Sequence, residues 1–467
     1  MQLCCNNFLK IQSSKMKKER ANFGSKQGII LATAGSSVGL GNVWRFPYMT
    51  GENGGAAFLL VYIACIFLLG IPGMLSEFII GRHGQANAAK AYDKLSKGRP
   101  WKLAGYLGII TSIIILGFYS VVAGWCCEYL YVSLSGHMLG DVSQVQQYFV
   151  TFSTHLWRPL LWGVVFILLT HVVIVRGVRK GIEQASKWLM PILLVLLVVL
   201  MVASCLLPNA LEGIRFLLMP DFSKITGQVI LEALGQAFFS LSLGTACLCT
   251  YASYFQRETN LLHSAGQIAL LDTLIALMAG LIIFPAIASV GIDPTSGPPL
   301  IFITLPNVFQ QAFGGIPALC YVVSIMFYAL LVFAALTSTI SMHEIGTAFF
   351  SEEFQLPRKK SAWIISTVAG VICILCAWSG GAFPDLQFMG MPLLEFCDQL
   401  TANYLLPLGG MLACLFVGWY IPRQTAFDEF TNAGSVNRRF FQLFLFVVRY
   451  ICPIAILLVF LHQSGIL

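Results

Sequence analysis

Several carboxylates stand inside long apolar stretches of this 467-residue chain, where an ionised side chain is costly to bury, and three of them are candidate functional residues. They are Glu77, Asp272 and Asp398. Arg45 stands in another such stretch, at a depth similar to that expected for Asp398, and could pair with it. A carboxylate in these surroundings binds a cation or forms an ion pair, so the residues indicate ion chemistry. A purely structural buried pair, or a side chain reaching out from a helix end, is the alternative.

Two of the apolar stretches contain residues that interrupt a helix. One reads Gly35-Ser36-Ser37-Val38-Gly39-Leu40-Gly41-Asn42, and the other reads Ser240-Leu241-Ser242-Leu243-Gly244-Thr245. Glycine costs about 1 kcal/mol in a helix interior, and unwound backbone is tolerated in a bilayer only where it lines a polar cavity. Close helix packing through small residues would explain one such stretch. Two of them predict a binding site where helix N-termini face an anion and freed carbonyls coordinate a cation.

Membrane-spanning helices must position these residues. Hydrophobic residues make up 57% of the chain and charged residues only 10%, against about 25% charged residues in a soluble protein. This composition excludes a soluble enzyme, a nucleic-acid-binding protein and a disordered scaffold. We expect about eleven spans, since about 20 apolar residues cross a bilayer. They lie near 27–50, 56–80, 104–135, 157–176, 185–207, 228–254, 266–290, 316–351, 361–379, 393–419 and 440–463.

Basic residues set the expected orientation. Most of the 28 Lys and Arg residues fall in the tail before the first span and in every second loop. Because basic loops stay cytoplasmic, we expect a multi-pass protein of the cell (cytoplasmic) membrane with its N-terminus inside. The net charge of +7 then reflects topology and not a nucleic-acid partner. No signal-peptide pattern precedes the first span, and either Met1 or Met16 could be the start.

The interruptions fall in the first and sixth spans, which an inverted repeat of five spans plus five predicts. The predicted fold class is therefore an all-α polytopic membrane protein with broken helices 1 and 6. We divide it into a cytoplasmic tail (1–26), a first repeat (27–207), an extracellular loop (208–227), an inverted second repeat (228–419), and an eleventh span with a short extracellular C-terminus (440–467).

A membrane enzyme is the main competing class, and the sequence disfavours it. The seven histidines form no i, i+4 pair, and His343-Glu344 lacks the second histidine of a zinc-protease motif. Cys373-x-x-Cys376 has redox spacing but lies in an apolar run, where cysteine behaves as a small hydrophobic residue. We therefore expect no catalytic residues.

Several long motifs resemble the neurotransmitter:sodium symporter family, in its bacterial amino-acid transporter branch. They are GSSVGLGNVWRFP from Gly35, ENGGA from Glu52, GIP from Gly70, GQAFFSLS from Gly235 and TYASY from Thr250. They occur in the family's order, and the resemblance runs from about Asn22 to the end of the chain. It implies sodium-coupled amino-acid uptake by alternating access. A membrane amino-acid sensor with a transporter fold stays open as the alternative.

The resemblance also implies binding residues, position by position. Sodium site 1 would use Ser37, Asn42, Ser240 and Asp272 together with the substrate carboxylate, and sodium site 2 would use Gly35, Val38, Ala334, Thr337 and Ser338. The substrate site would comprise Ser36, Ser37, Leu40, Gly41, Ile115, Tyr119, Phe239, Ser240, Ser242, Thr245, Ser338 and Met342. The implied outer gate pairs Arg45 with Asp398 above Tyr119 and Phe239. The inner gate pairs Arg20 with Glu352, backed by Phe23 and Tyr254, and Glu77 is a structural buried carboxylate.

Chloride-dependent members of this family carry Asn where this chain has Asp272 and Ser where it has Ala276. An ionised Asp272 would supply the negative charge that chloride brings, and two anions so close would repel each other. We therefore expect transport that uses two Na⁺ and no chloride. The implied pocket has no charged lining side chain, which favours a large neutral L-amino acid, aromatic or branched aliphatic. The sequence leaves open which amino acid it is, and whether the protein is a monomer or a homodimer.

Overall fold

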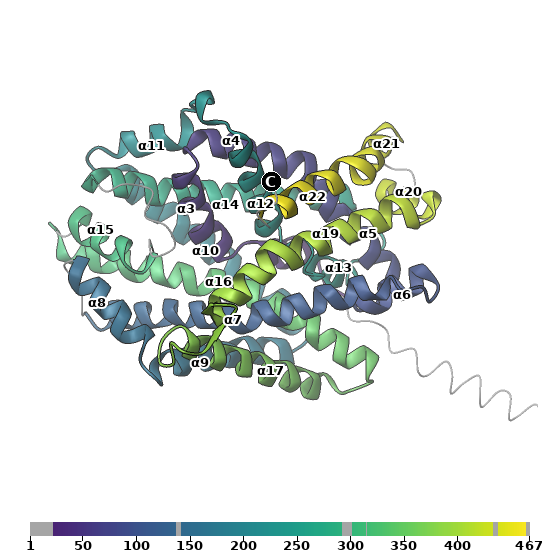
Figure 1. Cartoon of the computed structure of the whole chain (residues 1–467), viewed down its shortest axis with the longest axis horizontal. Helices are drawn as coiled ribbons and strands as arrows, with labels where there is room; N and C mark the ends of the chain where they lie inside the picture. Colours follow the sequence, from purple (N-terminus) through teal and green to yellow (C-terminus); the bar gives the residue numbers. More distant parts are fainter. Residues whose placement is uncertain (1–21, 137–141, 292–300, 314, 433–437, 464–467) are drawn as a thin grey trace, which may run out of the picture.

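The computed structural model describes residues 22–136, 142–291, 301–313, 315–432 and 438–463, and it is almost entirely helical (Figure 1). Nine helices of the described part are long and apolar enough to cross a membrane. Their bounds are Ala56–Gly84, Lys102–Leu134, Arg158–Val175, Val178–Cys205, Leu261–Val290, Pro317–Glu353, Arg358–Ser379, Leu393–Tyr420 and Arg438–His462. Together with two interrupted spans, they account for the eleven predicted from the sequence.

Most of these spans are single α-helices, and four contain π-helical turns. The continuous ones are α7 (Lys102–Leu134), α9 (Arg158–Val175), α14 (Leu261–Val290), α16 (Pro317–Glu353) and α17 (Arg358–Ser379). Each of the other four spans consists of consecutive helical segments. The second span is α4 (Ala56–Cys65) followed by α5 (Ile71–Gly84), and the fifth is η3 (Val178–Glu183) followed by α10 (Gln184–Cys205). The tenth is α18 (Leu393–Gln399), α19 (Leu406–Leu415) and η7 (Phe416–Tyr420), and the eleventh is α21 (Arg438–Phe446) followed by α22 (Cys452–Gln463). The fifth span begins at Val178 and not near 185, because its first turn carries charged residues that the apolar pattern excludes.

The first span breaks where glycine and serine gather. Helix α2 (Lys26–Ser37) ends where Val38 turns to an extended conformation, and the chain resumes as η1 (Gly41–Arg45) and α3 (Phe46–Glu52). Ser25 caps the start of α2 by accepting a hydrogen bond from the Gly28 amide at 3.0 Å. Because serine satisfies an otherwise unpaired helix amide, the helix begins at this residue.

The sixth span breaks between α12 (Gly227–Ser240) and α13 (Cys247–Ala252). Ser242, Gly244 and Ala246 all have positive φ angles, of 54°, 84° and 60°. Such angles are uncommon outside glycine. At Gly244 an added Cβ would also collide with the Leu406 carbonyl of α19. At the break, the backbone of the sixth span therefore packs directly against the backbone of the tenth span.

Short helices close the two ends of the bundle. Figure 1 places α8 (Val142–Ser153), α11 (Ala210–Leu218) and α15 (Thr304–Phe313) at one end, and α6 (Ala88–Ser96) and α20 (Arg423–Thr431) at the other. A hairpin of β1 (Gln387–Phe388) and β2 (Met391–Pro392) is the only sheet in the described residues.

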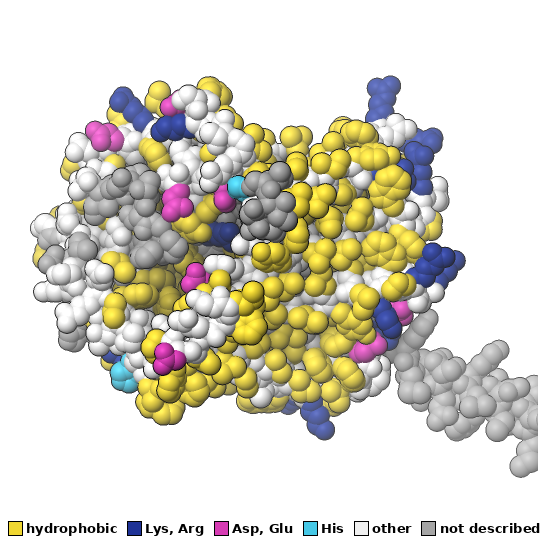
Figure 2. Space-filling model, in the orientation of Figure 1, with side chains coloured by type: hydrophobic (Ala, Val, Ile, Leu, Met, Phe, Trp, Pro, Cys, Tyr) yellow, Lys and Arg dark blue, Asp and Glu magenta, His cyan; other side chains and the backbone are white. Residues whose placement is uncertain are grey.

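The molecular surface has a broad hydrophobic region between these ends. Exposed side chains such as Leu68 (64%) and Val195 (62%) face outward along the spans. Figure 2 shows a continuous hydrophobic face, with Lys and Arg side chains gathered at the end where α6, α20 and α21 lie. Exposed apolar surface on this scale indicates contact with lipid, so the chain is a polytopic membrane protein.

Candidate functional site

Four buried polar side chains from four helices meet beside the two interruptions. The Asn42 amide donates to Asp272 Oδ1 at 2.8 Å and to Ser240 Oγ at 3.1 Å, and Ser240 Oγ donates to Asp272 Oδ2 at 2.7 Å. The Tyr62 hydroxyl donates to Ser240 Oγ at 3.1 Å. All four side chains are at most 1% exposed. We call Asn42, Tyr62, Ser240 and Asp272 the carboxylate cluster.

The chemistry of the carboxylate cluster suits a small hard cation. Its groups are a carboxylate, two hydroxyls and an amide, and hard oxygen donors favour alkali and alkaline-earth ions over transition metals. The described residues contain no group of three or more His, Cys, Asp or Glu side chains of the kind that holds a metal ion. Ser37, the remaining member predicted for sodium site 1, ends α2, and its hydroxyl is buried without a hydrogen-bond partner. Tyr62 joins the cluster although the prediction for this site left it out.

A second oxygen cluster joins the broken end of α2 to α16. The Val38 carbonyl accepts hydrogen bonds from Thr337 Oγ1 at 3.2 Å and from Ser338 Oγ at 3.1 Å. Thr337 Oγ1 also donates to the Ala334 carbonyl at 2.9 Å. Gly35 lies against Thr337, since a Cβ added at Gly35 would be 3.4 Å from the Thr337 Cβ. The five residues predicted for sodium site 2 therefore come together, and their donor atoms are oxygens.

A small cavity adjoins the broken helices. Its lining residues are Ser37, Gly39, Gly41, Ile115, Phe118, Tyr119, Phe239, Ser242, Thr245, Ser338, Met342 and Leu406. None of these side chains is charged. Three predicted residues, Ser36, Leu40 and Ser240, do not line it, and three lining residues were missed. Gly39 belongs to the interrupted motif and Phe118 precedes Tyr119, but no signal in the sequence marks Leu406.

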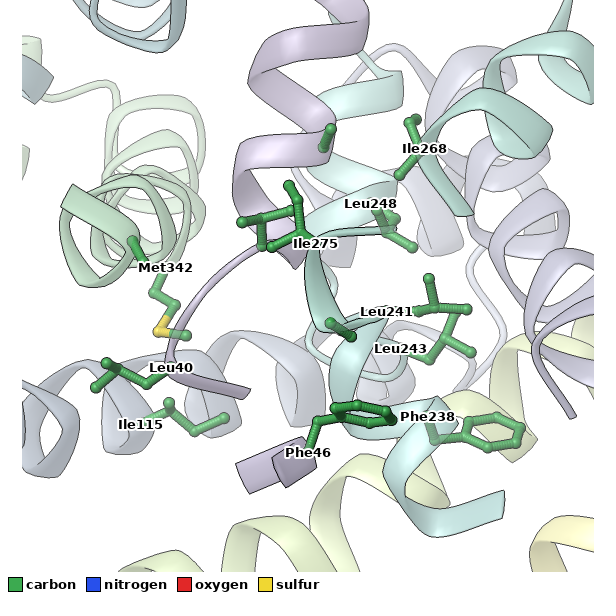
Figure 3. Close-up of a cluster of buried hydrophobic side chains, with 14 of the residues drawn as sticks. Leu40, Phe46, Ile115, Phe238, Leu241, Leu243, Leu248, Ile268, Ile275 and Met342 are labelled. Carbon is green, nitrogen blue, oxygen red and sulfur yellow. The ribbon is translucent and has the colours of Figure 1, made fainter. Parts of the chain in front are cut away.

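The cavity has a polar side and an apolar side. On the polar side, the Leu40 amide donates to the Tyr119 hydroxyl at 2.9 Å, and Ser242 Oγ donates to the Ser36 carbonyl at 3.1 Å. On the apolar side, Ile115 of α7 and Met342 of α16 approach each other (Figure 3). Unwound backbone with hydroxyls next to an uncharged apolar lining suits a ligand with a charged head and a hydrophobic side chain.

Glu77 holds the interrupted stretch of the sixth span in place. Its carboxylate is 2% exposed and accepts hydrogen bonds from the Gly244 amide at 2.7 Å and from the Cys249 amide at 3.3 Å. Ser112 Oγ also donates to the Thr245 carbonyl, at 2.6 Å. Glu77 thus replaces the hydrogen bonds that unwinding removes from this backbone.

The direct ion pair expected between Arg45 and Asp398 does not form among the described side chains. The Arg45 guanidinium instead lies over the Phe239 ring, with its Cζ 4.4 Å from the ring centroid, and its Nε has no hydrogen-bond partner. Cation–π attraction to a desolvated ring is worth about 0.5–2 kcal/mol, so it accounts for this arrangement. Phe239 also lines the cavity, so Arg45 stacks on a ring that forms part of its wall.

At the opposite end lie the described residues of the predicted inner gate. Arg20 lies outside the described residues, and Glu352 accepts hydrogen bonds from the Asn87 amide at 2.7 Å and from its side chain at 3.2 Å. The Tyr254 hydroxyl donates to Glu344 Oε1 at 2.8 Å, and Glu344 also pairs with Arg358. Phe23 packs edge-on against Tyr254, with ring centroids 6.0 Å apart.

Glu344 and Arg358 were not among the residues predicted for the inner gate. Glu344 nevertheless has the feature that marked Glu77 and Asp272, a carboxylate inside an apolar span. It stands inside the predicted span 316–351 and is 0% exposed. The pairing of a buried carboxylate with an arginine avoids an isolated charge. If the hydrogen bond from Tyr254 breaks, the Glu344 carboxylate therefore stays paired with Arg358.

Glu429 joins α20 to the end of the second span. Its carboxylate accepts from Arg82 Nε at 2.5 Å and lies 3.0 Å from His83 Nδ1, and its carbonyl accepts from Arg82 Nη2 at 2.6 Å. Burial raises the pKa of Glu429, but the hydrogen bond with His83 and the charge of Arg82 outweigh it and hold this pKa below its usual range. Arg82 also donates to the Thr259 carbonyl.

Comparison with known proteins gives a consistent result. The profile of the Sodium:neurotransmitter symporter family matches residues 20–146 and 153–465. An uncharacterized sodium-dependent transporter YhdH of Bacillus subtilis is 39% identical over 97% of this chain and 99% of its own length, and one from Haemophilus influenzae is 32% identical over 96% and 98%. The crystal structure of MhsT in complex with L-phenylalanine is similar with a TM-score of 0.87, at 40% identity, over 95% of this chain and 100% of that one.

Proposed function

The chain belongs to the sodium:neurotransmitter symporter family and is a sodium-dependent membrane transporter, and from that premise we propose that it imports a large neutral L-amino acid. The observation that carries the proposal is the uncharged cavity between the two broken helices, polar on one side and apolar on the other. The similarity to a protein crystallised with L-phenylalanine supports a hydrophobic substrate.

In this proposal the polar side of the cavity binds the amino-acid backbone. The Leu40 and Gly41 amides and the Tyr119 hydroxyl bind the α-carboxylate, since amides at a helix N-terminus favour an anion. The carbonyls near Ser37 and Phe239 and the Ser242 hydroxyl lie near the α-ammonium. The side chain lies against Ile115, Phe239, Thr245 and Met342, where an aromatic or branched aliphatic group finds apolar contact.

Two Na⁺ accompany the substrate. One binds Ser37, Asn42, Ser240 and Asp272 and contacts the substrate carboxylate, so that each ligand raises the affinity for the other. The second binds Gly35, Val38, Ala334, Thr337 and Ser338 and links the first span to the eighth. Asp272 makes chloride unnecessary, because its charge already balances the first Na⁺.

Alternating access follows from the two gates and from the repeat of five spans plus five. Arg45 and Phe239, together with Asp398, close the outer side, and Tyr254, Glu344 and Arg358, with the predicted pair of Arg20 and Glu352, close the inner side. We infer that the N-terminus is cytoplasmic, because the basic residues gather at the end that carries α6 and α20. The inward Na⁺ gradient drives uptake, with about 2.3 kcal/mol per charge for each 100 mV of membrane potential.

The test is uptake into proteoliposomes across a panel of radiolabelled amino acids, with and without an inward Na⁺ gradient. We expect accumulation of aromatic or branched aliphatic amino acids that requires Na⁺ and persists when gluconate replaces chloride. Accumulation that collapses without chloride would refute the role of Asp272. Binding of the amino acid without Na⁺-dependent accumulation would mark a sensor, and cross-linking of the reconstituted protein would separate a monomer from a homodimer.

A further inference from the structure

A second cavity lies at the start of α7, away from the proposed substrate site. It is an open apolar groove, lined by Pro100, Trp101, Leu103, Ala104, Leu107 and Leu412. The first five residues stand at or just before the first turns of α7, and Leu412 comes from α19. Leu103 is 61% exposed, so the groove opens to the surroundings of the protein. None of these residues belongs to the sodium sites, the substrate site or the gates.

Two exposed cations are the chain neighbours of residues that line the groove. Arg99 precedes Pro100, and Lys102 follows Trp101. The Arg99 guanidinium lies over the Tyr420 ring, with its Cζ 5.7 Å from the ring centroid. Neither cation forms an ion pair with a carboxylate in the part of the chain that the structure describes. Both charges can therefore bind an anionic ligand.

Aromatic packing keeps the rim of the groove in place. The Trp101 ring lies 4.9 Å from the Phe416 ring and 5.5 Å from the Tyr420 ring, between centroids. The Tyr420 hydroxyl donates to the Ser96 carbonyl at 3.0 Å and thereby fixes η7 to the end of α6. Tryptophan and tyrosine are enriched where a bilayer meets water. The rim thus has the composition of a membrane interface.

The position of the groove matches this composition. It lies where α6 ends and α7 begins, at the end of the molecule where Lys and Arg side chains gather beside the continuous hydrophobic face (Figure 2). A ligand here has its polar part beside cations and its remainder along apolar helices. Basic pockets between transmembrane helices on the cytoplasmic side bind anionic lipid headgroups.

We propose that this groove binds one anionic phospholipid. Arg99 and Lys102 bind the phosphate of its headgroup, and an acyl chain lies along Leu103, Leu107 and Leu412. A free phosphate ion fits less well, because the lining of the groove offers no buried polar donor to an anion. The proposal is independent of which amino acid is transported, since the groove and the substrate cavity share no residue.

The experiment measures phospholipid binding to the intact purified protein by native mass spectrometry, with phosphatidylglycerol and phosphatidylcholine of the same acyl chains. We expect one tightly held phosphatidylglycerol and no comparable phosphatidylcholine. Arg99→Gln together with Lys102→Gln should weaken this binding about 25-fold, since each cation near an anionic membrane surface contributes a factor of about five. The matched control, Lys359→Gln with Lys360→Gln, removes two basic residues from the first turn of α17 and should leave the binding unchanged.

A further variant tests the acyl-chain contact without changing charge. Leu103→Trp narrows the exposed edge of the groove and should weaken phosphatidylglycerol binding, while uptake in the proteoliposome assay shows that the variant is folded. Equal binding of both lipids, or equal loss in the control pair, would overturn the proposal. Displacement of the lipid by inorganic phosphate alone would overturn it in favour of a simple anion site. A dimer that dissociates in Leu103→Trp would overturn it in favour of an interface between two copies of the chain.

Discussion

Asp272→Asn tests the proposed coupling of Na⁺ to the buried carboxylate. The two side chains have nearly the same shape, so the substitution removes the negative charge and leaves the packing almost unchanged. In the structure both carboxylate oxygens accept hydrogen bonds, from Asn42 at 2.8 Å and from Ser240 at 2.7 Å. Asparagine keeps one acceptor and turns the other into a donor, which removes one of these bonds as well as the charge.

The expected size of the effect follows from the charge. Two unit charges 4 Å apart attract by about 4 kcal/mol at an effective dielectric constant of about 20. The amide oxygen of asparagine still coordinates the ion and recovers part of this energy, which leaves a loss of about 2–4 kcal/mol. Since about 1.4 kcal/mol is a factor of ten, the half-saturating Na⁺ concentration should rise by about 30-fold to 1,000-fold.

The assay is initial uptake into proteoliposomes as a function of external Na⁺, with chloride or gluconate as the anion. Asp272→Asn together with Ala276→Ser should recover uptake when chloride is present, because the anion then supplies the missing charge. Glu128→Gln is the matched control. It neutralises another buried carboxylate, which binds Tyr148 and Arg158, and should lower stability without changing Na⁺ dependence. An unchanged half-saturating Na⁺ concentration in Asp272→Asn would refute the reasoning.

Three further predictions concern stability, selectivity and pH. Glu77→Gln weakens the support for the interrupted sixth span and should lower the unfolding free energy by about 2 kcal/mol, whereas an unchanged melting temperature would contradict that role. Thr245→Phe narrows the cavity and should raise the ratio of leucine to tryptophan uptake about 10-fold, and a constant ratio would remove Thr245 from the side-chain pocket. His83 and Arg82 lower the pKa of Glu429 in the folded protein, so its ionised carboxylate stabilises the folded state. This contribution to folding stability is fully present above pH 4.5, the usual pKa of the group, and is lost as the pH falls through the folded pKa. Thermal unfolding of Glu429→Gln should therefore show lower stability than wild type at neutral pH and a difference that shrinks in acid, and a pH-independent difference would count against this linkage.

The amino-acid sequence predicted the span pattern well because a bilayer imposes a strong local constraint. About 20 apolar residues must follow one another in each span, and this regularity is visible without any tertiary contact. The two interrupted spans were visible for the same reason, since glycine and serine in an apolar run are costly wherever the helix packs. The fifth span began earlier than expected because its first turn carries Arg179 and Lys180, which hydropathy assigns to a loop.

Tertiary structure decided which polar residues meet. Asn42, Ser240 and Asp272 are far apart in the chain, and only the packing of three helices brings them within hydrogen-bond distance. The family resemblance anticipated this grouping, while no local pattern contains it. Tyr62 joins the same cluster through its hydroxyl, which sequence reasoning had not included among the ligands.

The sequence by itself determined that this chain is an all-α membrane protein and where its helices break, because hydropathy and backbone propensity are local properties. The tertiary structure decided the contacts at both gates. Arg45 stacks on Phe239 and forms no ion pair with Asp398, and the Tyr254 hydroxyl donates to Glu344. Such contacts form only between rings and charged groups that lie within a few ångströms of each other. That proximity is set by how the helices pack and not by the order of their residues.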